Sequence, residues 1–371
     1  MITTWWSAAL AAGAGAFVVA LVATGVIRWL AGSWQIVDRP DNGRKQHAKA
    51  TPLLGGLGIY LGWLAVIGWL LTTPWLVGKN ISVKEIVAVA IAGLVIVVAG
   101  ALDDRWSLRP WQQLIGPILA VGLVVAGGVG IDKVTNPLGG FIFLNQATWV
   151  VAWYQGVPLT VTLWSDLFSG LWLLGMMYTT KLLDGLDGLV SGIGIIGAVI
   201  IFLLSTTTQW WQPDTAVLAA VVSGAIGGFL VFNWHPASIF LGEGGALLVG
   251  FFLGILSIIA GGKIATALLI MGLPILDVIW VIARRLLWEK RDPFRTADRK
   301  HLHFRLLDAG FSIRQAVVIL WSLALMFGSL ALLLQSRGKL LALGALGLIM
   351  VLLAGGLLAV NRLPGSQPRS S

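Results

Sequence analysis

The chain of 371 residues contains no cysteine, and only 11% of its residues are charged. The absence of cysteine excludes a disulfide framework and a thiolate metal site. So little charge, together with 57% hydrophobic residues, excludes an ordinary soluble domain and indicates a polytopic membrane protein. Nineteen tryptophans fit the two aromatic belts of such a protein. We therefore predict an all-α membrane fold that forms a single domain over residues 1–371.

Long apolar runs fill the sequence between short polar breaks. Cutting at those breaks leaves about eleven segments, each near the roughly 20 residues that a helix needs to cross a bilayer. They cover residues 5–30, 54–77, 86–102, 111–131, 164–183, 189–204, 215–232, 246–259, 264–287, 316–334 and 340–360. The first run is too long for the apolar region of a signal peptide, so we expect a retained span. Residues 132–163 are expected to form an outside loop or small hairpin without chemistry of its own.

The distribution of basic residues predicts how the helices are oriented. If the loops alternate between two sides, one side holds 19 of the 25 lysine and arginine residues. The positive-inside rule makes that side cytoplasmic, with the N-terminus outside and the C-terminus in the cytoplasm. This side includes a basic loop over residues 284–314. The net charge of +9 therefore reflects membrane orientation, and we expect no nucleic-acid partner.

The stretch 181–189 stands out because it carries two aspartates between long apolar runs. On a helix, Asp184 and Asp187 would share one face, since they are three residues apart. Gly185 and Gly188 would let a ligand approach closely. Charged groups at a membrane boundary are costly and are functional by default. A polar turn whose aspartates cap the flanking helices is the alternative interpretation.

Four more polar clusters fall on the same predicted side of the membrane. Asp103 and Asp104 are adjacent carboxylates that repel each other, so holding both requires a cation, a base or solvent. Glu243 lies among glycines at the mouth of a span, which suits a group held against a ligand. The other two clusters, at residues 38–56 and 298–305, are basic and could neutralise phosphate groups. Solvated loops, a capped helix start and an interfacial amphipathic helix are the corresponding structural alternatives.

Together and in this order, the five stretches resemble the polyprenyl-phosphate N-acetylhexosamine-1-phosphate transferases of glycosyltransferase family 4. The resemblance covers residues 38 to about 315 and favours the bacterial undecaprenyl-phosphate GlcNAc-1-phosphate branch. The matching residues are Asp38-Arg39-Pro40, Arg44-Lys45, His47, Gly55-Gly56, Leu102-Asp103-Asp104-Arg105, Asp184-Gly185-Leu186-Asp187-Gly188-Leu189, Asn233, Pro236-Ala237, Phe240, Gly242, Pro274, Asp277 and His301-Leu302-His303.

The resemblance implies that a UDP-N-acetylhexosamine, with GlcNAc as the expected sugar, gives its sugar phosphate to undecaprenyl phosphate and releases UMP. It implies an integral protein of the bacterial inner membrane whose active site faces the cytoplasm and uses Mg²⁺, and it allows a homodimer. The residues expected to be catalytic are Asp103, Asp104, Asp187, His301 and His303. Those expected to bind substrate are Asp184, Gly185, Gly188, Lys181, Arg299, Arg305, Lys45 and Asn233. The expected metal ligands are Glu243 and Asp187.

The chain departs from the family pattern at five positions. Lys181 replaces an asparagine and Glu243 an aspartate, at two positions that commonly supply Mg²⁺ ligands in the family. Gln113 replaces a lysine, Phe304 the last histidine of the basic loop, and Tyr178 an asparagine. A protonated lysine cannot bind a metal, so the first of these changes alters the chemistry most.

These substitutions leave two interpretations of the site. In one, Lys181 pairs with Glu243, and its ammonium group stands in for the charge of a metal. In the other, the site has lost catalysis and the protein acts as a scaffold. A phospho-MurNAc-pentapeptide transferase and a lipid- or ion-coupled transporter are further alternatives. The transporter is disfavoured because the charges gather at one membrane face and the sequence shows no internal repeat.

Overall fold

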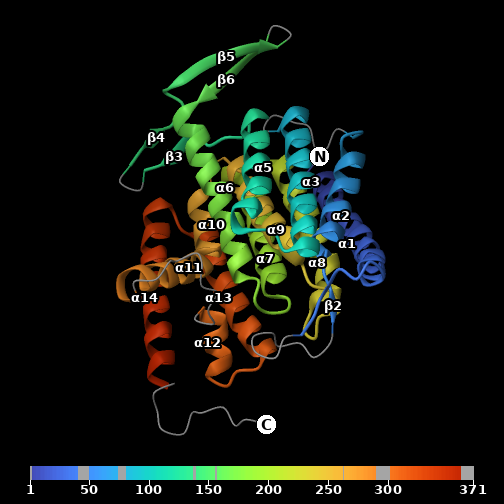
Figure 1. Ribbon diagram of the computed structural model, residues 1–371. Helices are drawn as coiled ribbons and strands as arrows, with labels where there is room; N and C mark the ends of the chain where they lie inside the picture. Colours follow the sequence, from blue (N-terminus) through green and yellow to red (C-terminus); the bar gives the residue numbers. More distant parts are fainter. Residues whose placement is uncertain are drawn as a thin grey trace.

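The computed structural model describes residues 2–40, 50–73, 81–136, 139–154, 157–261, 263–289 and 301–360. Most of these residues are helical and form one bundle, with short strands at its two ends (Figure 1). The predicted all-α class therefore describes the bundle. Three two-stranded antiparallel sheets add a β component, of which the sequence analysis expected at most one small hairpin.

The elements follow one another along the chain with short connections. The helices are α1 (Ile2–Ser33), α2 (Gly55–Leu70), α3 (Val83–Trp106), α4 (Pro110–Gln113), α5 (Ile115–Ala126), α6 (Leu163–Leu183), α7 (Leu189–Ser205), α8 (Pro213–Asn233), α9 (Gly242–Ile259), α10 (Ile264–Ile270), α11 (Gly272–Arg284), α12 (Leu302–Asp308), α13 (Ile313–Leu333) and α14 (Ser336–Val360). The short helical turns are η1 (Thr208–Trp210) and η2 (Arg285–Glu289). The strands are β1 (Val37–Asp38), β2 (Thr51–Pro52), β3 (Lys133–Thr135), β4 (Phe141–Phe143), β5 (Thr148–Tyr154) and β6 (Val157–Thr162).

Five helices of the described chain are long and apolar enough to cross a bilayer, namely α1, α3, α8, α9 and α13. This supports a polytopic membrane protein, but it is fewer than the roughly eleven spans expected from apolar runs of about 20 residues. Three of the predicted spans correspond to shorter apolar helices: α2, the α4–α5 pair and α7. The apolar run 111–131 extends beyond the end of α5 at Ala126, whereas α7 covers the whole run 189–204 and has only 17 residues.

The predicted span 264–287 is bent rather than straight. Helices α10 and α11 meet at an angle of 75°, with Met271 between them. Pro274 explains why one helix cannot run through this point, because proline has no N–H and its ring clashes with the carbonyl group four residues earlier. The pair adds a sixth crossing when its two arms are counted as one broken span.

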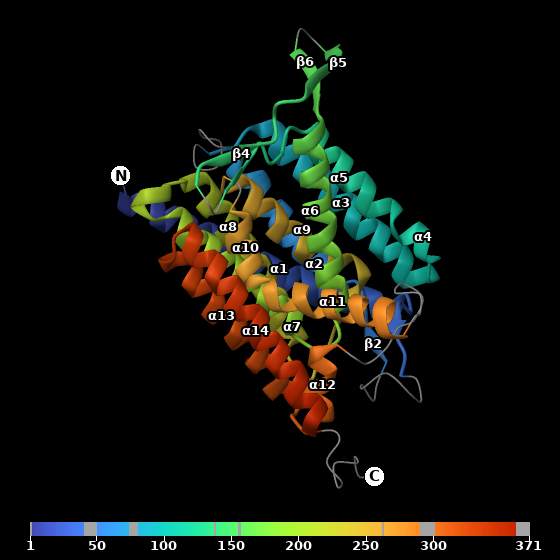
Figure 2. The ribbon, with the colours of Figure 1, turned by 90° about the vertical axis from the view of Figure 1, so that its left-hand side faces the viewer.

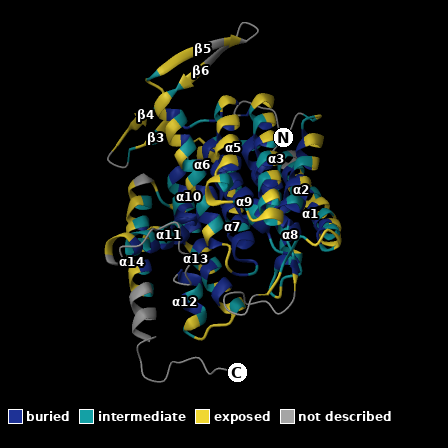
Figure 3. Ribbon diagram, viewed as in Figure 1, coloured by how far each residue is buried: buried dark blue, intermediate teal, exposed yellow. Residues whose placement is uncertain are grey.

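Helix α9 forms the centre of the bundle, and α2, α3 and α6 pack around it. In α9, 83% of an apolar stretch of 18 residues is buried. The corresponding share in α1 is 28%, so α1 lies at the periphery of the bundle (Figure 3). Close packing of α3 on α9 depends on glycine, because a Cβ on Gly100 would overlap the backbone of Gly244. Small residues allow membrane helices to approach each other in this way.

The segment between α5 and α6 forms two hairpins, which agrees with the expected loop or small hairpin over residues 132–163. Strands β5 and β6 pair from Thr148 and Thr162 to Tyr154 and Val157. Figures 1 and 2 show this hairpin projecting from one end of the bundle, whereas β2 and α12 lie toward the opposite end. Because α6 starts at the hairpin and leads away from it, the aspartate loop at 184–188 lies at the end that carries α12.

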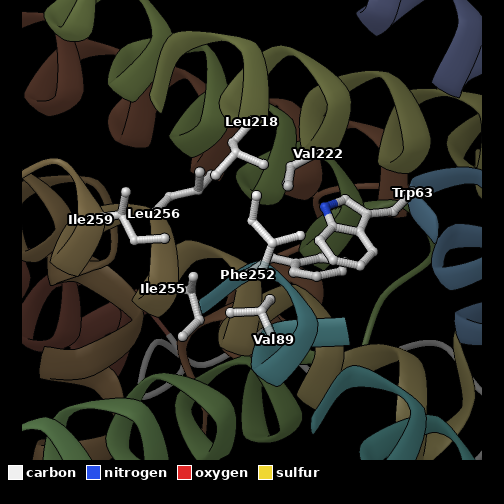
Figure 4. Close-up of a pocket in the computed structure, with 9 residues that line it drawn as sticks. Trp63, Val89, Leu218, Val222, Phe252, Ile255, Leu256 and Ile259 are labelled. Carbon is white, nitrogen blue, oxygen red and sulfur yellow. The ribbon is translucent and has the colours of Figure 1, made fainter. Parts of the chain in front are cut away.

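A pocket inside the bundle lies between α2, α3, α8 and α9 (Figure 4). Its lining is aliphatic and aromatic and consists of Trp63, Ile86, Val89, Leu218, Val222, Phe252, Ile255, Leu256 and Ile259. None of these side chains can act as an acid or a base or bind a phosphate group by charge. The polar residues at the helix ends are therefore the better candidate for a chemical site.

Candidate active site

Residues 184–188 form the loop between α6 and α7. The helix face predicted for Asp184 and Asp187 is wrong, because α6 ends at Leu183 and α7 begins at Leu189. Gly188 has a φ of +79°, a left-handed conformation that glycine adopts without steric cost, and it precedes the first residue of α7. The two aspartates therefore lie in a turn, and their side chains contact different residues.

Asp187 is held by the segment that follows α8. Its Oδ2 accepts hydrogen bonds from His235 Nδ1 at 2.7 Å and from the Ala237 N–H at 3.0 Å. Arg314, in the first turn of α13, donates to the His235 carbonyl oxygen at 2.9 and 3.1 Å. Sequence analysis did not single out His235 or Arg314, although His235 falls in the polar cluster after α8 and could have been noted there.

Asn233 supports the aspartate loop from inside the protein. Its Oδ1 accepts hydrogen bonds from the Gly188 N–H at 3.0 Å and the Ser191 hydroxyl at 2.9 Å, and its Nδ2 donates to the Ile239 carbonyl at 3.1 Å. Only 4% of Asn233 is exposed. The structure therefore gives Asn233 a positioning role, and its contact with substrate stays a prediction.

Carboxylates gather where α3 ends and α9 begins. Asp104 Oδ1 accepts the backbone N–H of Glu243 at 3.0 Å, and Asp103 Oδ1 accepts a backbone N–H of the following loop at 2.7 Å. Gly242 has a φ of +70°, and a Cβ there would overlap Asp104 Oδ2. The exposed Asp184 is close enough for its charge to interact with those of Asp104 and Glu243. Desolvation by the surrounding protein, and then the neighbouring carboxylates, raise the pKa of Asp184 to about 8, so a nearby cation is needed to stabilise the ionised carboxylates at this end of α9.

Lys181 reaches this cluster from the last turn of α6. Its Nζ forms an ion pair with Glu243 Oε1 and donates a hydrogen bond to Gln113 Oε1 at 2.9 Å. Gln113 Nε2 donates in turn to both oxygens of Asp103, at 3.1 and 3.2 Å. The Tyr178 ring centroid lies 5.4 Å from Nζ. The ion pair predicted between Lys181 and Glu243 is therefore present, and Gln113 connects it to Asp103.

His301 and His303, which the sequence predicted to be catalytic, lie inside the protein. His301 Nδ1 donates to Asp277 Oδ2 at 2.8 Å. His303 is 1% exposed, packs against Gly185 and has no side-chain hydrogen-bond partner among the described residues. Burial, and then the charge of the neighbouring His301, lower the pKa of His303 to about 3. His303 is therefore neutral at physiological pH and supports the aspartate loop by packing, so it cannot neutralise a phosphate group.

The remaining predicted residues are placed in different surroundings. Arg305 lies on α12 and is buried, with 8% of the residue exposed. Lys45 and Arg299 lie outside the described residues. Asp277, which the sequence analysis used only as part of a motif, also accepts the Leu302 N–H at 2.9 Å and so fixes the start of α12.

The two predicted metal ligands do not form a site for Mg²⁺ in the ranges that the structure covers. Mg²⁺ needs a nearly octahedral set of oxygen ligands. Glu243 is instead engaged by the Lys181 ammonium group, and one oxygen of Asp187 is engaged by His235 and Ala237. In the same ranges, no three or more His, Asp or Glu side chains are arranged to hold a metal ion. The donor set around Glu243 therefore does not fit a divalent cation.

Comparison with known proteins assigns this region to a family. A family model described as glycosyl transferase family 4 matches residues 86–261, which include the carboxylate cluster, Lys181 and the aspartate loop. A probable undecaprenyl-phosphate N-acetylglucosaminyl 1-phosphate transferase of Bacillus subtilis (strain 168) is 30% identical over 331 residues, covering 86% of this chain and 84% of that protein.

Two other similar proteins differ in the sugar phosphate for which they are named. A decaprenyl-phosphate N-acetylglucosaminephosphotransferase of Mycobacterium leprae (strain TN) is 32% identical over 346 residues, covering 85% of this chain and 82% of that protein. A phospho-N-acetylmuramoyl-pentapeptide-transferase of Halalkalibacterium halodurans is 28% identical over 310 residues, covering 80% of this chain and 87% of that protein. The similarity in each case extends over most of both chains.

Proposed function

The chain belongs to glycosyl transferase family 4, and from this premise we propose that it transfers N-acetylglucosamine 1-phosphate from UDP-GlcNAc to undecaprenyl phosphate and releases UMP. Two similar proteins are named for transfer of this sugar phosphate to undecaprenyl or decaprenyl phosphate. We place the reaction at the cytoplasmic face of a bacterial inner membrane, as the first membrane step of cell-envelope glycan synthesis. The excess of basic residues on one side of the chain supports this orientation.

The observation that carries the proposal is the position of the loop 184–188. Asp184 lies beside the carboxylates of α3 and α9, and Asp187 is oriented by His235. Gly185 packs against the first turn of α12. The loop thus joins the three groups of residues that the family resemblance assigns to one site. It also lies at the ends of membrane helices, where a water-soluble nucleotide sugar and a lipid phosphate can meet.

The surface beside Asp103 and Asp104 suits a lipid substrate. Leu102 and Trp106, in the last turns of α3, are 40% and 66% exposed. Apolar and aromatic side chains favour the interface between bilayer and water. The undecaprenyl chain is proposed to lie along this end of α3, with its phosphate near Lys181.

In the proposed reaction, an oxygen of undecaprenyl phosphate attacks the phosphorus that carries the sugar, and the bond from this phosphorus to the departing oxygen of UMP breaks. A phosphate monoester is largely dianionic at pH 7, because its second pKa is about 6, so little deprotonation is needed. Catalysis then depends on positioning two polyanions and stabilising their charge. Lys181 supplies positive charge, while Asp103 and Asp104 position it through Gln113 and through the backbone of Glu243.

The direct test is UMP release by the purified protein supplied with UDP-GlcNAc and undecaprenyl phosphate, with the lipid-linked product identified by its mass. UDP-N-acetylmuramoyl-pentapeptide as donor tests the alternative substrate. Asp187→Asn should reduce UMP release, whereas Asp132→Asn, at the hairpin end of the bundle, is a matched control that should leave it unchanged. If folded protein releases no UMP from either donor, the transferase proposal fails and the scaffold interpretation remains.

A further inference from the structure

We propose, on the basis of the transferase function above, that the Lys181 ammonium group is a resident cation of the active site. It fills the position that a divalent cation would need in order to contact Glu243. In this arrangement the protein binds no divalent cation at Glu243, and Lys181 itself contacts the phosphate groups of the substrate.

Lys181 is anchored on two sides and remains partly open on a third. Its Nζ contacts Glu243 Oε1 and donates to Gln113 Oε1 at 2.9 Å. An ammonium group has three N–H donors, so one donor remains for a ligand. The side chains of Lys181 and Glu243 are 21% and 18% exposed, which places the pair at the border of the protein interior. A substrate oxygen can therefore reach the ammonium group without breaking the ion pair.

Gln113 determines where the ammonium group lies. Its Nε2 donates to both oxygens of Asp103 and to the Leu108 carbonyl oxygen at 3.2 Å. These bonds turn its Oε1 toward Lys181, since the opposite orientation of the amide would direct N–H groups at a cation. The position of the ammonium group is therefore fixed by Asp103 as well as by Glu243, through a chain of four side chains.

The charges around Lys181 explain why a cation is needed and why it is not a metal ion. The charge of Glu243 interacts with those of Lys181 and Asp103, and Asp184 lies close enough to interact with the charge of Glu243. An ammonium group already in contact with Glu243 repels a second cation at the same oxygen. Mg²⁺ also binds through oxygen atoms and gives up its water reluctantly. A divalent cation that the reaction uses would therefore have to bind elsewhere than at Glu243.

A fixed ammonium group suits the proposed bond cleavage. Negative charge grows on the departing UMP as its bond to the sugar-bearing phosphorus breaks. A preorganised cation stabilises such developing charge without rearranging during the reaction. Lys181 is therefore assigned a catalytic role, in which its free N–H contacts an oxygen of the diphosphate.

The test compares Mn²⁺ binding, measured by electron paramagnetic resonance without nucleotide, in the wild type and in Lys181→Asn. The proposal predicts that Lys181→Asn gains a bound Mn²⁺, because oxygens of Glu243 and Gln113 are released. The double variant Lys181→Asn with Glu243→Gln should lose this added ion, because it lacks the carboxylate. Lys84→Asn, at the hairpin end of α3, is the matched control and should bind Mn²⁺ as the wild type does. Equal Mn²⁺ binding in the wild type and Lys181→Asn overturns the proposal.

Thermal unfolding with and without Mn²⁺ keeps the test decisive if the single variant is unstable. Removing Lys181 leaves Glu243 without its partner, which destabilises a partly buried carboxylate. Mn²⁺ should then stabilise Lys181→Asn more than it stabilises the wild type, because the ion replaces the ammonium group. A variant that Mn²⁺ stabilises no more than the wild type contradicts the proposal.

UMP release separates this proposal from the transferase proposal on which it rests. Lys181→Met should lower UMP release by roughly tenfold or more, whereas Lys181→Arg, which keeps a positive charge, should retain more of it. If the wild type and Lys181→Asn differ in Mn²⁺ binding as predicted while the wild type releases no UMP, the transferase function is rejected. That result still supports Lys181 as a resident cation. Full UMP release by Lys181→Met rejects the catalytic role of Lys181.

Discussion

His235 donates a hydrogen bond of 2.7 Å from Nδ1 to Asp187 Oδ2 and so ties the segment after α8 to the loop that precedes α7. The Ala237 N–H shares the same carboxylate oxygen, and Arg314 of α13 holds the His235 carbonyl. Three elements that are distant in sequence thus fix one carboxylate. The other oxygen of Asp187 has no hydrogen-bond partner among the described residues and is therefore available to a substrate.

Removing the imidazole of His235 should reduce catalysis by releasing Asp187. We expect His235→Ala to lower kcat/KM for UMP release by about tenfold to a hundredfold, because a hydrogen bond to a charged group contributes about 1.5–3 kcal/mol. His235→Asn can present an amide N–H near the position of Nδ1 and should retain most of the activity. Steady-state kinetics of both variants provide the measurement, and an equal loss in the two would contradict a positioning role.

Burial of His303 should make the protein sensitive to acid. Its pKa of about 3 in the folded protein lies below the ordinary value of 6.5, so the unfolded chain takes up a proton first as the pH falls. The stability contributed by neutral His303 is therefore complete above about pH 6.5 and is lost progressively between about pH 6.5 and pH 3. At about pH 5 the loss in the free energy of unfolding should be about 2 kcal/mol.

Thermal unfolding of the wild type and His303→Gln in detergent measures this effect. The variant should be less stable than the wild type at neutral pH, because it replaces a closely packed ring. It should lose less stability than the wild type between neutral pH and about pH 5, because glutamine does not titrate there. The prediction is wrong if the two proteins lose the same stability over this interval.

The contact between α3 and α9 should tolerate no side chain at Gly100. A methyl group there meets the backbone of Gly244, which cannot rotate away as a side chain would. We expect Gly100→Ala to lower stability by about 1–3 kcal/mol, the usual cost of overpacking. Gly122→Ala on α5 is the matched control, since a Cβ there meets nothing within 4 Å and alanine favours helix. Thermal unfolding of the pair decides the prediction, which fails if Gly100→Ala is as stable as Gly122→Ala.

The orientation of the protein in the membrane can be tested by cysteine labelling, because the natural chain contains no cysteine. Single cysteines at exposed positions on the two ends of the bundle are suitable, Arg109→Cys beside the carboxylate cluster and Gln146→Cys beside the hairpin. A membrane-impermeant reagent should label Gln146→Cys in intact cells and label Arg109→Cys only after the membrane is opened. The reverse pattern would place the candidate active site outside the cytoplasm and contradict the proposed use of a nucleotide sugar.

The sequence predicted the polar residues of the site better than it predicted their surroundings. Charged residues such as Asp103 and Glu243 stand out in apolar runs because each is costly near a membrane. The pairing of Lys181 with Glu243 could also be predicted, because a lysine replaces an asparagine of the family pattern while a glutamate replaces an aspartate, which places opposite charges at the two positions. These inferences depend on residue identity alone, which is why they did not require a structure.

Other features depend on the path of the backbone and could not be predicted. Asp184 and Asp187 do not share a helix face, because the chain turns between them. His303 is buried, but a histidine within a basic stretch has the same local sequence whether it packs inside or meets water. Its contact with Gly185 links segments that are far apart in the chain. The bend between α10 and α11 is a partial exception. Pro274 in the sequence indicates a break in the helix, whereas the continuous apolar run 264–287 indicates one straight span.

Helix α9 also limits how this sequence can drift during evolution. All of its residues from Gly242 to Ile259 are buried except Glu243 and Ile259 themselves. A peripheral helix such as α1 presents a lipid-facing side on which one apolar residue can replace another with little effect, and α9 presents no such side. Selection should therefore remove most new substitutions from α9 and accept many in α1. The rate at which each helix changes among descendants of this protein should then follow its depth in the bundle.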